Sequence, residues 1–378
     1  MSDRANPGYA RRLDERVARQ QAFFAGREPG DLIVFVNRGR HTSLEGFLCG
    51  EFHRDGPERV LNPKHIDAMV GRYVERARES LRDVYAIDDD CVPSGAFVYA
   101  GIGVINATIT GLEPFHDECT SWLEPNLPWE QIEKLRFDPD NKWVRFALDV
   151  NRALGRRWEG DWFVLPFLHR SPFDAANGVR GNVLFEEMYT EPDRIKKLID
   201  WCADWSISME RFLAENAPSP APKGWGIAIW DTWLPDGGVF VNGDPVGLIS
   251  RKMMPEFEQP YTAKLFTTLG GGFFHSHTIG LYQVDQVART AGVLVQQFGV
   301  DPKVPNLPEV LLGGGPMAER ILAASLDAPI MIEGIAPDTL DALLPIVKQG
   351  RFVLACGAPE GTDPDEIARK VRAASNFR

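Results

Sequence analysis

Residues 328–355 read APIMIEGIAPDTLDALLPIVKQGRFVLA. Two short apolar runs, 328–332 and 351–355, enclose a segment over 337–348 in which apolar residues recur at helical spacing. Continuous apolar runs of this length are typical of strands buried on both faces of a parallel sheet. Pro337 suits the first turn of a helix, where the missing N–H has no partner to lose. The stretch therefore predicts a strand, a helix and a second strand parallel to the first.

Working outward, the same alternation recurs along the chain. Further apolar runs lie at 31–36, 96–100, 162–166, 226–230, 272–274 and 293–295, and further helical patterns at 191–214, 282–291, 316–326 and 364–374. Eight strands alternating with helices predict an α/β fold, a single closed (β/α)8 barrel of the TIM type. No glycine-rich dinucleotide fingerprint follows the first strand, which disfavours an open doubly wound sheet. We expect residues 31–378 to form the barrel and residues 1–30 to form a helical extension before it.

Composition narrows the class of partner. The 378 residues are 44% hydrophobic and 25% charged, and they carry a net charge of -12. An acidic chain is poorly suited to nucleic acid or to an anionic membrane, because phosphate neutralisation needs clustered Lys and Arg. Five irregularly spaced cysteines predict reduced thiols, and no apolar run reaches the length of a membrane helix. We expect a soluble cytoplasmic protein that acts on a small molecule.

Candidate metal ligands stand at the predicted strand ends, where barrels concentrate their chemistry. His275 and His277 alternate along one strand, so both imidazoles lie on the same side of it. Cys356 ends the last strand and would complete a nitrogen, nitrogen and sulfur set that suits zinc with an open position. In the alternative interpretation, the histidines cap the strand by hydrogen bonding and Cys356 is a small core residue. Asp231 and Glu333 also lie at predicted strand ends.

A rival cluster of possible ligands lies in one loop. His116, Asp117, Glu118 and Cys119 follow one another directly. Acidic clusters of this kind are usually solvated turns, so we favour the strand-end residues.

Several motifs, in this order, resemble the uroporphyrinogen decarboxylase-like superfamily. They are Ser171-Pro172-Phe173-Asp174 with Val179-Arg180-Gly181, Tyr189-Thr190-Glu191-Pro192, Gly247-Leu248-Ile249-Ser250 with Glu256-Phe257 and Pro260-Tyr261, and Cys356-Gly357-Ala358-Pro359-Glu360. The resemblance runs through most of the chain and implies a single (β/α) barrel. It is nearer to the zinc-dependent corrinoid and thiol methyltransferases than to the decarboxylases. The decarboxylases have an Arg-Gln-Ala-Gly-Arg segment after the first strand, where this chain has Asn37-Arg38-Gly39-Arg40-His41.

The resemblance also implies a site. His275, His277 and Cys356 fall on the positions of the methyltransferase zinc ligands, and His277 replaces a cysteine. The His₂Cys set carries less negative charge than a cysteine-rich one, which makes the zinc a stronger Lewis acid and favours an oxygen acceptor or activated water. Gln297 stands where the methyltransferases carry a carboxylate, and Glu333 is expected to supply an oxygen ligand or base instead.

The main expectation is a zinc-dependent methyltransferase. It would move a methyl group from a methylated corrinoid, carried by a partner protein, to a thiol or related small acceptor. Asp231, Glu333 and Gln297 are the candidate catalytic residues, and Arg180, Trp230 and Tyr282 the candidate substrate-binding residues. A second copy of the chain, forming a homodimer, is a further expected partner.

Two alternatives come from other classes. A metal-independent decarboxylase or lyase would hold a carboxylated substrate with Arg38, Arg40 and Arg180, because guanidinium groups bind carboxylates in a bidentate manner. In the other alternative, a barrel that has lost catalysis would serve as a binding subunit. This interpretation is motivated by His277 and Gln297, which differ from the residues that the methyltransferases carry at these positions.

Overall fold

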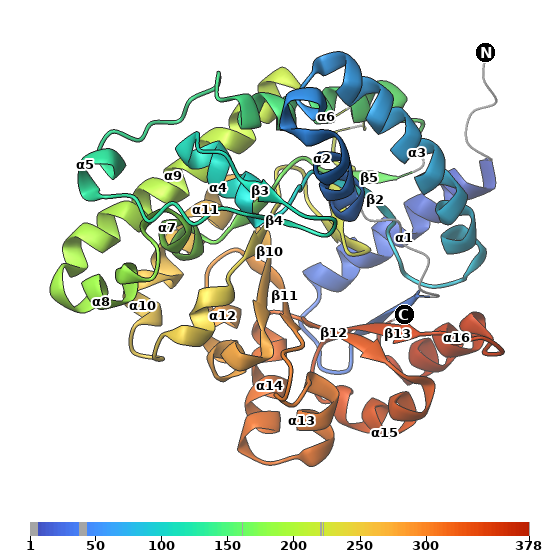
Figure 1. Cartoon of the computed structure of the whole chain (residues 1–378). Coiled ribbons are helices and arrows are strands. Elements are labelled where there is room, and N and C mark those ends of the chain that lie inside the picture. The colour runs from blue at the N-terminus through green and yellow to red at the C-terminus, as the bar shows by residue number, and fades with distance from the viewer. Residues whose placement is uncertain (1–6, 38–43, 161, 220, 222, 378) are drawn as a thin grey trace.

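A seven-stranded parallel sheet forms the centre of the molecule (Figure 1). The structure, a computed structural model, describes all residues except 1–6, 38–43, 161, 220, 222 and 378. In spatial order the strands are β1 (Leu32–Asn37), β13 (Phe352–Gly357), β12 (Ile330–Ile335), β11 (Val293–Gly299), β10 (Gly272–His277), β9 (Val239–Asn242) and β6 (Leu168–Arg170). Beyond β6, the strand β5 (Phe163–Leu165) pairs in parallel with β2 (Ser94–Phe97). The order is consistent with a TIM-like barrel.

Helices connect and cover these strands. The α-helices are α1 (Pro7–Ala25), α2 (Leu44–Val60), α3 (Pro63–Ala86), α4 (Ile102–Thr110), α5 (Trp129–Ile132), α6 (Lys142–Arg157), α7 (Pro172–Arg180), α8 (Val183–Thr190), α9 (Pro192–Asn216), α10 (Met254–Phe257), α11 (Gln259–Leu269), α12 (Val284–Ala288), α13 (Leu307–Gly313), α14 (Pro316–Asp327), α15 (Pro337–Val347) and α16 (Pro364–Ala374). Two 3-10 helices, η1 (Asp244–Leu248) and η2 (Thr278–Gln283), follow β9 and β10. In the described part of the chain, every helix is too short or too polar to cross a membrane. Helix α1 lies within the predicted extension, whose boundary at residue 30 stays a prediction.

The predicted run at 226–230 is not a strand of the seven-stranded sheet, and its assignment is corrected. Strand β7 (Ile227–Ile229) instead pairs antiparallel with β8 (Thr232–Leu234) across a two-residue turn. Both turn residues, Trp230 and Asp231, have positive φ angles of 45° and 60°. That backbone is the one a tight hairpin of this length requires. The sheet strands β9 and β6 were not among the predicted runs.

Side chains on alternating strand positions pack into two separate clusters. The main core takes Ile33 and Phe35 of β1 and Val353 of β13. A second, helix-facing cluster takes residues of the opposite parity from the same strands, together with residues of α14, α15 and α16. These three helices lie along the outside of β12 and β13 (Figure 1). A side chain's position along its strand therefore decides whether it faces the main core or the helices.

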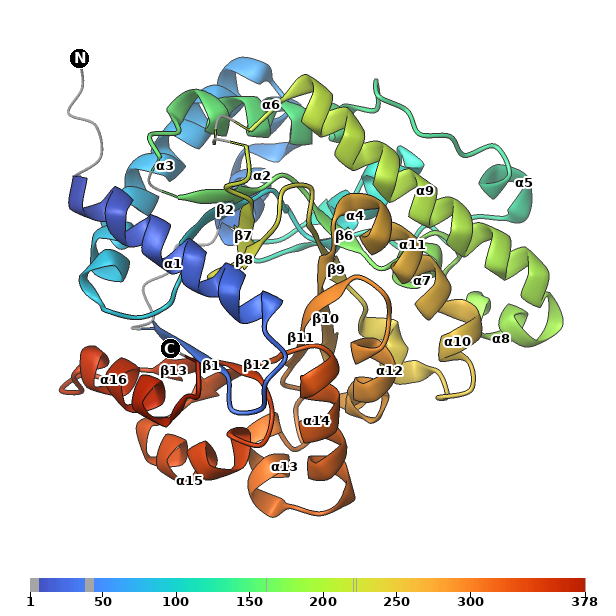
Figure 2. The same cartoon turned by 180° about the vertical axis from the view of Figure 1, so that it is seen from behind.

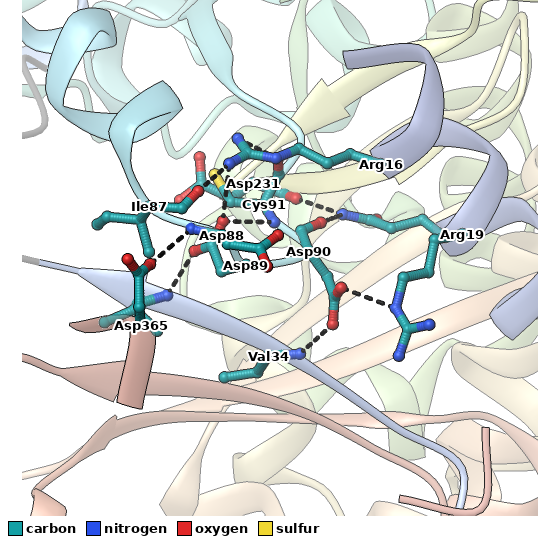
Figure 3. A network of polar contacts seen from close by, with 12 residues as sticks. Arg16, Arg19, Val34, Ile87, Asp88, Asp89, Asp90, Cys91, Asp231 and Asp365 are labelled. Carbon is teal, nitrogen blue, oxygen red and sulfur yellow. Dashed lines mark hydrogen bonds and ion pairs between the residues drawn. The ribbon is translucent and has the colours of Figure 1, made fainter. Parts of the chain in front are cut away.

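The edge of β1 that faces β2 is covered by carboxylates (Figure 3). Within the described residues no ladder joins these two strands. The amides of Val34 and Val36 donate instead to Asp90 Oδ2 at 3.0 Å and Asp89 Oδ2 at 2.8 Å. Arg16 of α1 lies 3.3 Å from Asp89, whose burial raises its pKa to about 7. Buried carboxylates thus satisfy the amides of β1 just before β2 begins.

Helix α1 also fixes the β7–β8 hairpin, beside which it lies in Figure 2. The amide of Gln20 donates to the carbonyls of Asp90 and Asp231, each at 2.8 Å. Its oxygen accepts from the Trp233 amide at 2.7 Å. One fully buried side chain therefore joins α1, the hairpin and the segment before β2.

Candidate metal centre

Polar side chains occupy one register level across four neighbouring strands. Arg170 of β6 is paired in register with Asn242 of β9, Asn242 with His275 of β10, and His275 with Gln297 of β11. All four residues lie in the C-terminal parts of their strands. Parallel strands bring such residues to one edge of the sheet, which is where barrel enzymes carry their sites.

His275 and His277 lie side by side on β10, as the sequence predicts, with ring centroids 5.2 Å apart. The Nδ1 atom of His275 bonds to Oε1 of Gln297, whose Nε2 donates to Glu333 Oε2 at 2.7 Å. Because the amide nitrogen of Gln297 faces a carboxylate, its oxygen faces His275 and must accept the Nδ1 proton. His277 Nδ1 donates in the same way to Asp301 Oδ1 at 3.0 Å. In its neutral form each histidine therefore presents the lone pair of Nε2.

These two lone pairs face the carboxylate of Asp244. Its Oδ1 atom lies 3.7 Å from Nε2 of His275 and 3.4 Å from Nε2 of His277. Asn242 Nδ2 donates to the other oxygen, Oδ2, at 2.9 Å. Among the described residues, Oδ1 of Asp244 is buried and has no hydrogen-bond partner.

The arrangement fits a divalent cation. Ligand atoms of Asp244, His275 and His277 all lie within 4.8 Å of one another. Burial lowers the pKa of His275, an effect that Asp244 partly opposes, so the neutral imidazole that binds metals is favoured. Two imidazole nitrogens and one carboxylate oxygen are a ligand set that zinc accepts, with further positions left open. The outer partners Gln297 and Asp301 fix the ring orientations as supporting groups do in known metal sites.

The local sequence explains where Asp244 lies. Strand β9 ends at Asn242, and the amide of Gly243 then donates to the His275 carbonyl at 2.8 Å. A side chain at Gly243 would bring its Cβ to 2.5 Å from the ring of Phe274. Only glycine allows this close approach, which turns the chain directly into η1 and places Asp244 over the histidines.

Cys356, the third predicted ligand, is not part of this group in the described structure. It belongs to the helix-facing cluster together with its register partners Val36 and Ile335. Its neighbour Ala355 packs against the main core instead. Burial raises the pKa of the Cys356 thiol to about 12, which favours the protonated form. The alternation along β13 therefore directs this side chain away from the histidines.

The predicted catalytic residues divide into two groups. Gln297 and Glu333 meet at the site, where they orient His275. Surrounding protein raises the pKa of Glu333, although its side chain stays accessible to solvent. Asp231 lies in the hairpin turn and not at the end of a sheet strand, and its backbone bonds to Gln20 and Val92. The orienting role expected of Asp231 is filled by Gln297 and Asp301.

Of the predicted substrate-binding residues, only Trp230 reaches the histidines. Its ring lies edge-on to His275, at 5.3 Å between centroids, and packs on Phe240 and Phe273. The hydroxyl of Tyr282 donates to the carbonyl of Ile249 at 2.6 Å. It thus supports the segment after η1.

Arg180 has a structural partner away from the histidines. Its Nε and Nη2 atoms donate to both oxygens of Glu187, at 2.9 and 2.5 Å, and Nη1 donates to the carbonyl of Leu127. Arg38 and Arg40, also proposed to hold a carboxylated substrate, lie outside the described residues.

A cavity of about 350 Å³ opens beside His277 and Asp244. Strand β6, helix α7 and the loops after β9, β10 and β11 supply most of its wall. The lining residues are Ile102, Arg170, Asp174, Asn177, Asp244, Pro245, Leu248, His277, Ile279 and Asp301.

Sequence reasoning missed Asp244, Asp301, Arg170 and Asp174. The signal for Asp244 was the apolar run at 239–241 followed by Asn242-Gly243-Asp244-Pro245, which reads as a short strand and a turn. Asp301 similarly follows β11 directly after Gly299 and Val300.

The rival loop is a hairpin turn. His116 ends β3 (Phe115–His116), β4 (Ser121–Trp122) pairs with it, and Asp117 Oδ1 accepts from the amides of Cys119 and Thr120. The His116 ring stacks on Phe52 at 4.3 Å. A further group of possible ligands, Glu51, Asp55 and His65, has its carboxylates paired with Arg54, Arg59 and Arg72.

Comparison with known proteins finds similarity to methyltransferases. No protein-family model matches the chain. The methylcobamide:CoM methyltransferase MtbA of Methanosarcina mazei is 22% identical over 217 residues, which are 55% of this chain and 56% of that protein. A solved methyltransferase structure from the same organism has a TM-score of 0.55 at 13% identity and covers 96% of this chain and 98% of that one. The chain is thus weakly homologous over about half the length of one methyltransferase and shares the fold of another.

Proposed function

We propose that this chain is a zinc-dependent methyltransferase, with His275, His277 and Asp244 as the metal ligands. The observation that carries the proposal is the buried Asp244 Oδ1, which has no hydrogen-bond partner in the described structure and faces two imidazole lone pairs. Three such acceptor atoms repel one another unless a cation or a proton lies among them. The lowered pKa of His275 disfavours a proton on that imidazole.

The protein's own groups would prepare this centre for reaction. When bound, zinc would act as a Lewis acid that lowers the pKa of a thiol or hydroxyl at its open position. Gln297 and Asp301 hold the imidazoles in one tautomer, so the ligands need no rearrangement. Trp230, Phe240 and Phe273 pack beside His275 and limit access of water from that side. The adjoining cavity is large enough for a small acceptor.

The proposed methyl donor is a methylated corrinoid carried by a partner protein. The support is the name of the weakly similar relative, a methylcobamide:CoM methyltransferase. The acceptor would lose its proton to solvent and attack the methyl carbon, so that its new bond to carbon forms as the cobalt–carbon bond breaks and the corrinoid leaves as cobalt(I). We also infer that β2 and β5 complete a closed barrel, since the fold match covers nearly the whole chain. Strands β5 and β6 follow each other closely in the chain and count as one interrupted strand, which makes eight strands in all.

Elemental analysis of the purified protein tests the metal centre. We expect about one equivalent of zinc in the wild-type protein, and loss of that zinc in His275→Ala and Asp244→Ala. Cys356→Ser and His116→Ala serve as controls and are expected to retain it. Zinc lost from Cys356→Ser but kept by Asp244→Ala would restore the ligand set predicted from the sequence. Iron in place of zinc would point away from methyl transfer, because two histidines and one carboxylate also bind ferrous iron.

An activity assay tests the reaction. Zinc-loaded protein is mixed with free methylcobalamin and 2-mercaptoethanol, and the loss of the methylated corrinoid is followed by absorbance. We expect transfer that a chelator and Asp244→Ala both abolish. No transfer to any thiol or alcohol by a fully zinc-loaded protein would contradict the proposal.

A further inference from the structure

The part of the cavity wall that β6 and α7 supply is built from buried charged groups. Arg170, which is 8% exposed, donates from Nη2 to Asp174 Oδ1 at 2.5 Å and from Nη1 to Asn106 Oδ1 at 2.8 Å. A Cβ atom at Gly178 would come within 2.1 Å of Nη1, so the guanidinium lies directly on the backbone of α7. Arg170 is therefore held in place by two of its guanidinium nitrogens, while its buried Nε has no hydrogen-bond partner in the described structure.

Asp174 is held just as firmly, yet one of its oxygens is unused. Ser171 caps α7, and its Oγ accepts from the Asp174 amide at 3.2 Å and donates to Glu258 Oε2 at 3.0 Å. The Asp174 side chain is 1% exposed and lines the cavity. Within the described residues its Oδ2 atom has no hydrogen-bond partner. A buried carboxylate oxygen left in this state is costly unless a donor reaches it.

The charged residues that line the cavity indicate which hydrogen-bond donor can reach Asp174 Oδ2. Three carboxylates, those of Asp174, Asp244 and Asp301, line it against the single guanidinium of Arg170. A metal at the histidines would offset the charge near Asp244 and leave Asp174 and Arg170 as a neutral pair. An anionic group at this end would meet the carboxylate of Asp174, while Nη1 and Nη2 of the guanidinium already donate to Asn106 and Asp174.

We infer that the methyl acceptor is a small thiol or alcohol that carries a second group, an ammonium or a hydroxyl, and places that group against Asp174, and that carboxylated or sulfonated acceptors are excluded. This inference rests on the proposed function, because it assigns the acceptor of the same centre. Asp174 acts as a specificity residue, and Arg170 and Asn106 as positioning residues that hold it. The apolar residues Ile102, Pro245, Leu248 and Ile279 would contact the rest of the molecule.

Three thiols of similar length provide matched probes. They are 2-mercaptoethylamine, 2-mercaptoethanol and 3-mercaptopropionate, which differ in carrying an ammonium, a hydroxyl or a carboxylate. Protein loaded with cobalt(II) reports thiolate binding through a charge-transfer absorption band, independently of turnover. We expect the amine and the alcohol to bind at least about tenfold more tightly than the carboxylate, as a hydrogen bond to a charged group allows. The tighter binder of these two identifies the group that lies against Asp174 as an ammonium or as a hydroxyl.

Asp174→Asn tests the assigned residue, since it keeps the shape and the bond to Arg170 while removing the charge. In Asp174→Asn we expect the affinities for 2-mercaptoethylamine and 3-mercaptopropionate to differ by no more than about threefold. Asp193→Asn, at an exposed carboxylate on α9, should leave the ratio of these two affinities unchanged. Equal or tighter binding of 3-mercaptopropionate to the wild-type protein overturns the inference without any need for a folded variant. An unchanged preference in Asp174→Asn overturns it as well. If cobalt binds but no thiol alters its spectrum, the proposed function fails together with the inference.

Discussion

Replacing Gln297 with leucine should weaken zinc binding without touching a ligand. Gln297 is 2% exposed, and it joins His275 Nδ1 to Glu333 through two hydrogen bonds. Leucine has a similar volume but makes neither bond, so His275 can rotate and its Nδ1 proton has no acceptor. Loss of such an outer partner typically costs 10- to 100-fold in metal affinity. For Gln297→Leu this corresponds to about 1.4 to 2.7 kcal/mol.

The neighbouring residue supplies a matched control. Gln296 is also buried and carries the same amide, but it lies on the opposite face of β11 and its Nε2 donates to the Ala328 carbonyl at 3.4 Å. Gln296→Leu should therefore leave zinc affinity unchanged, even if it lowers stability. The assay is a competition titration of each variant with a chromophoric chelator. Equal zinc affinity in Gln297→Leu and the wild-type protein, or equal weakening in both variants, would refute the reasoning.

Three further predictions concern groups around the site and the fold. Cys356→Ser should keep its zinc yet lose about 1 to 3 kcal/mol in the free energy of unfolding, measured by urea denaturation, because it buries a hydroxyl in an apolar cluster. Gly243→Ala should lower zinc affinity, measured by the same chelator competition, since its Cβ would collide with Phe274 and displace the segment that carries Asp244. Glu187→Gln should lose about 1 kcal/mol at pH 7, because Arg180 holds the pKa of Glu187 below its ordinary value. That stabilisation is present above the unfolded pKa near 4.5 and disappears as the pH falls through the lowered folded value, so thermal unfolding of variant and wild type should converge once the pH is below that folded value.

Local pattern was sufficient for most individual elements. The helices predicted at 316–326 and 364–374 are α14 (Pro316–Asp327) and α16 (Pro364–Ala374), because a proline in the first turn and a clear apolar face define them. The run at 226–230 was misassigned because a strand of a hairpin and a strand of the sheet have the same local sequence. Nothing in Trp230-Asp231 resembles the usual Asn-Gly or Asp-Gly turn that would have identified the hairpin.

The sequence by itself determined the parallel α/β architecture and the pairing of two histidines on one strand. Both depend on periodicity along a short stretch, which strand geometry translates directly into a face. Only the tertiary structure decided what meets those histidines. The position of Cys356 along β13 directs its side chain toward the helix-facing cluster. The turn at Gly243, after the four residues of β9, brings Asp244 to the histidines. Register and loop direction depend on contacts between segments far apart in the chain, so no local pattern could identify the third member of the group.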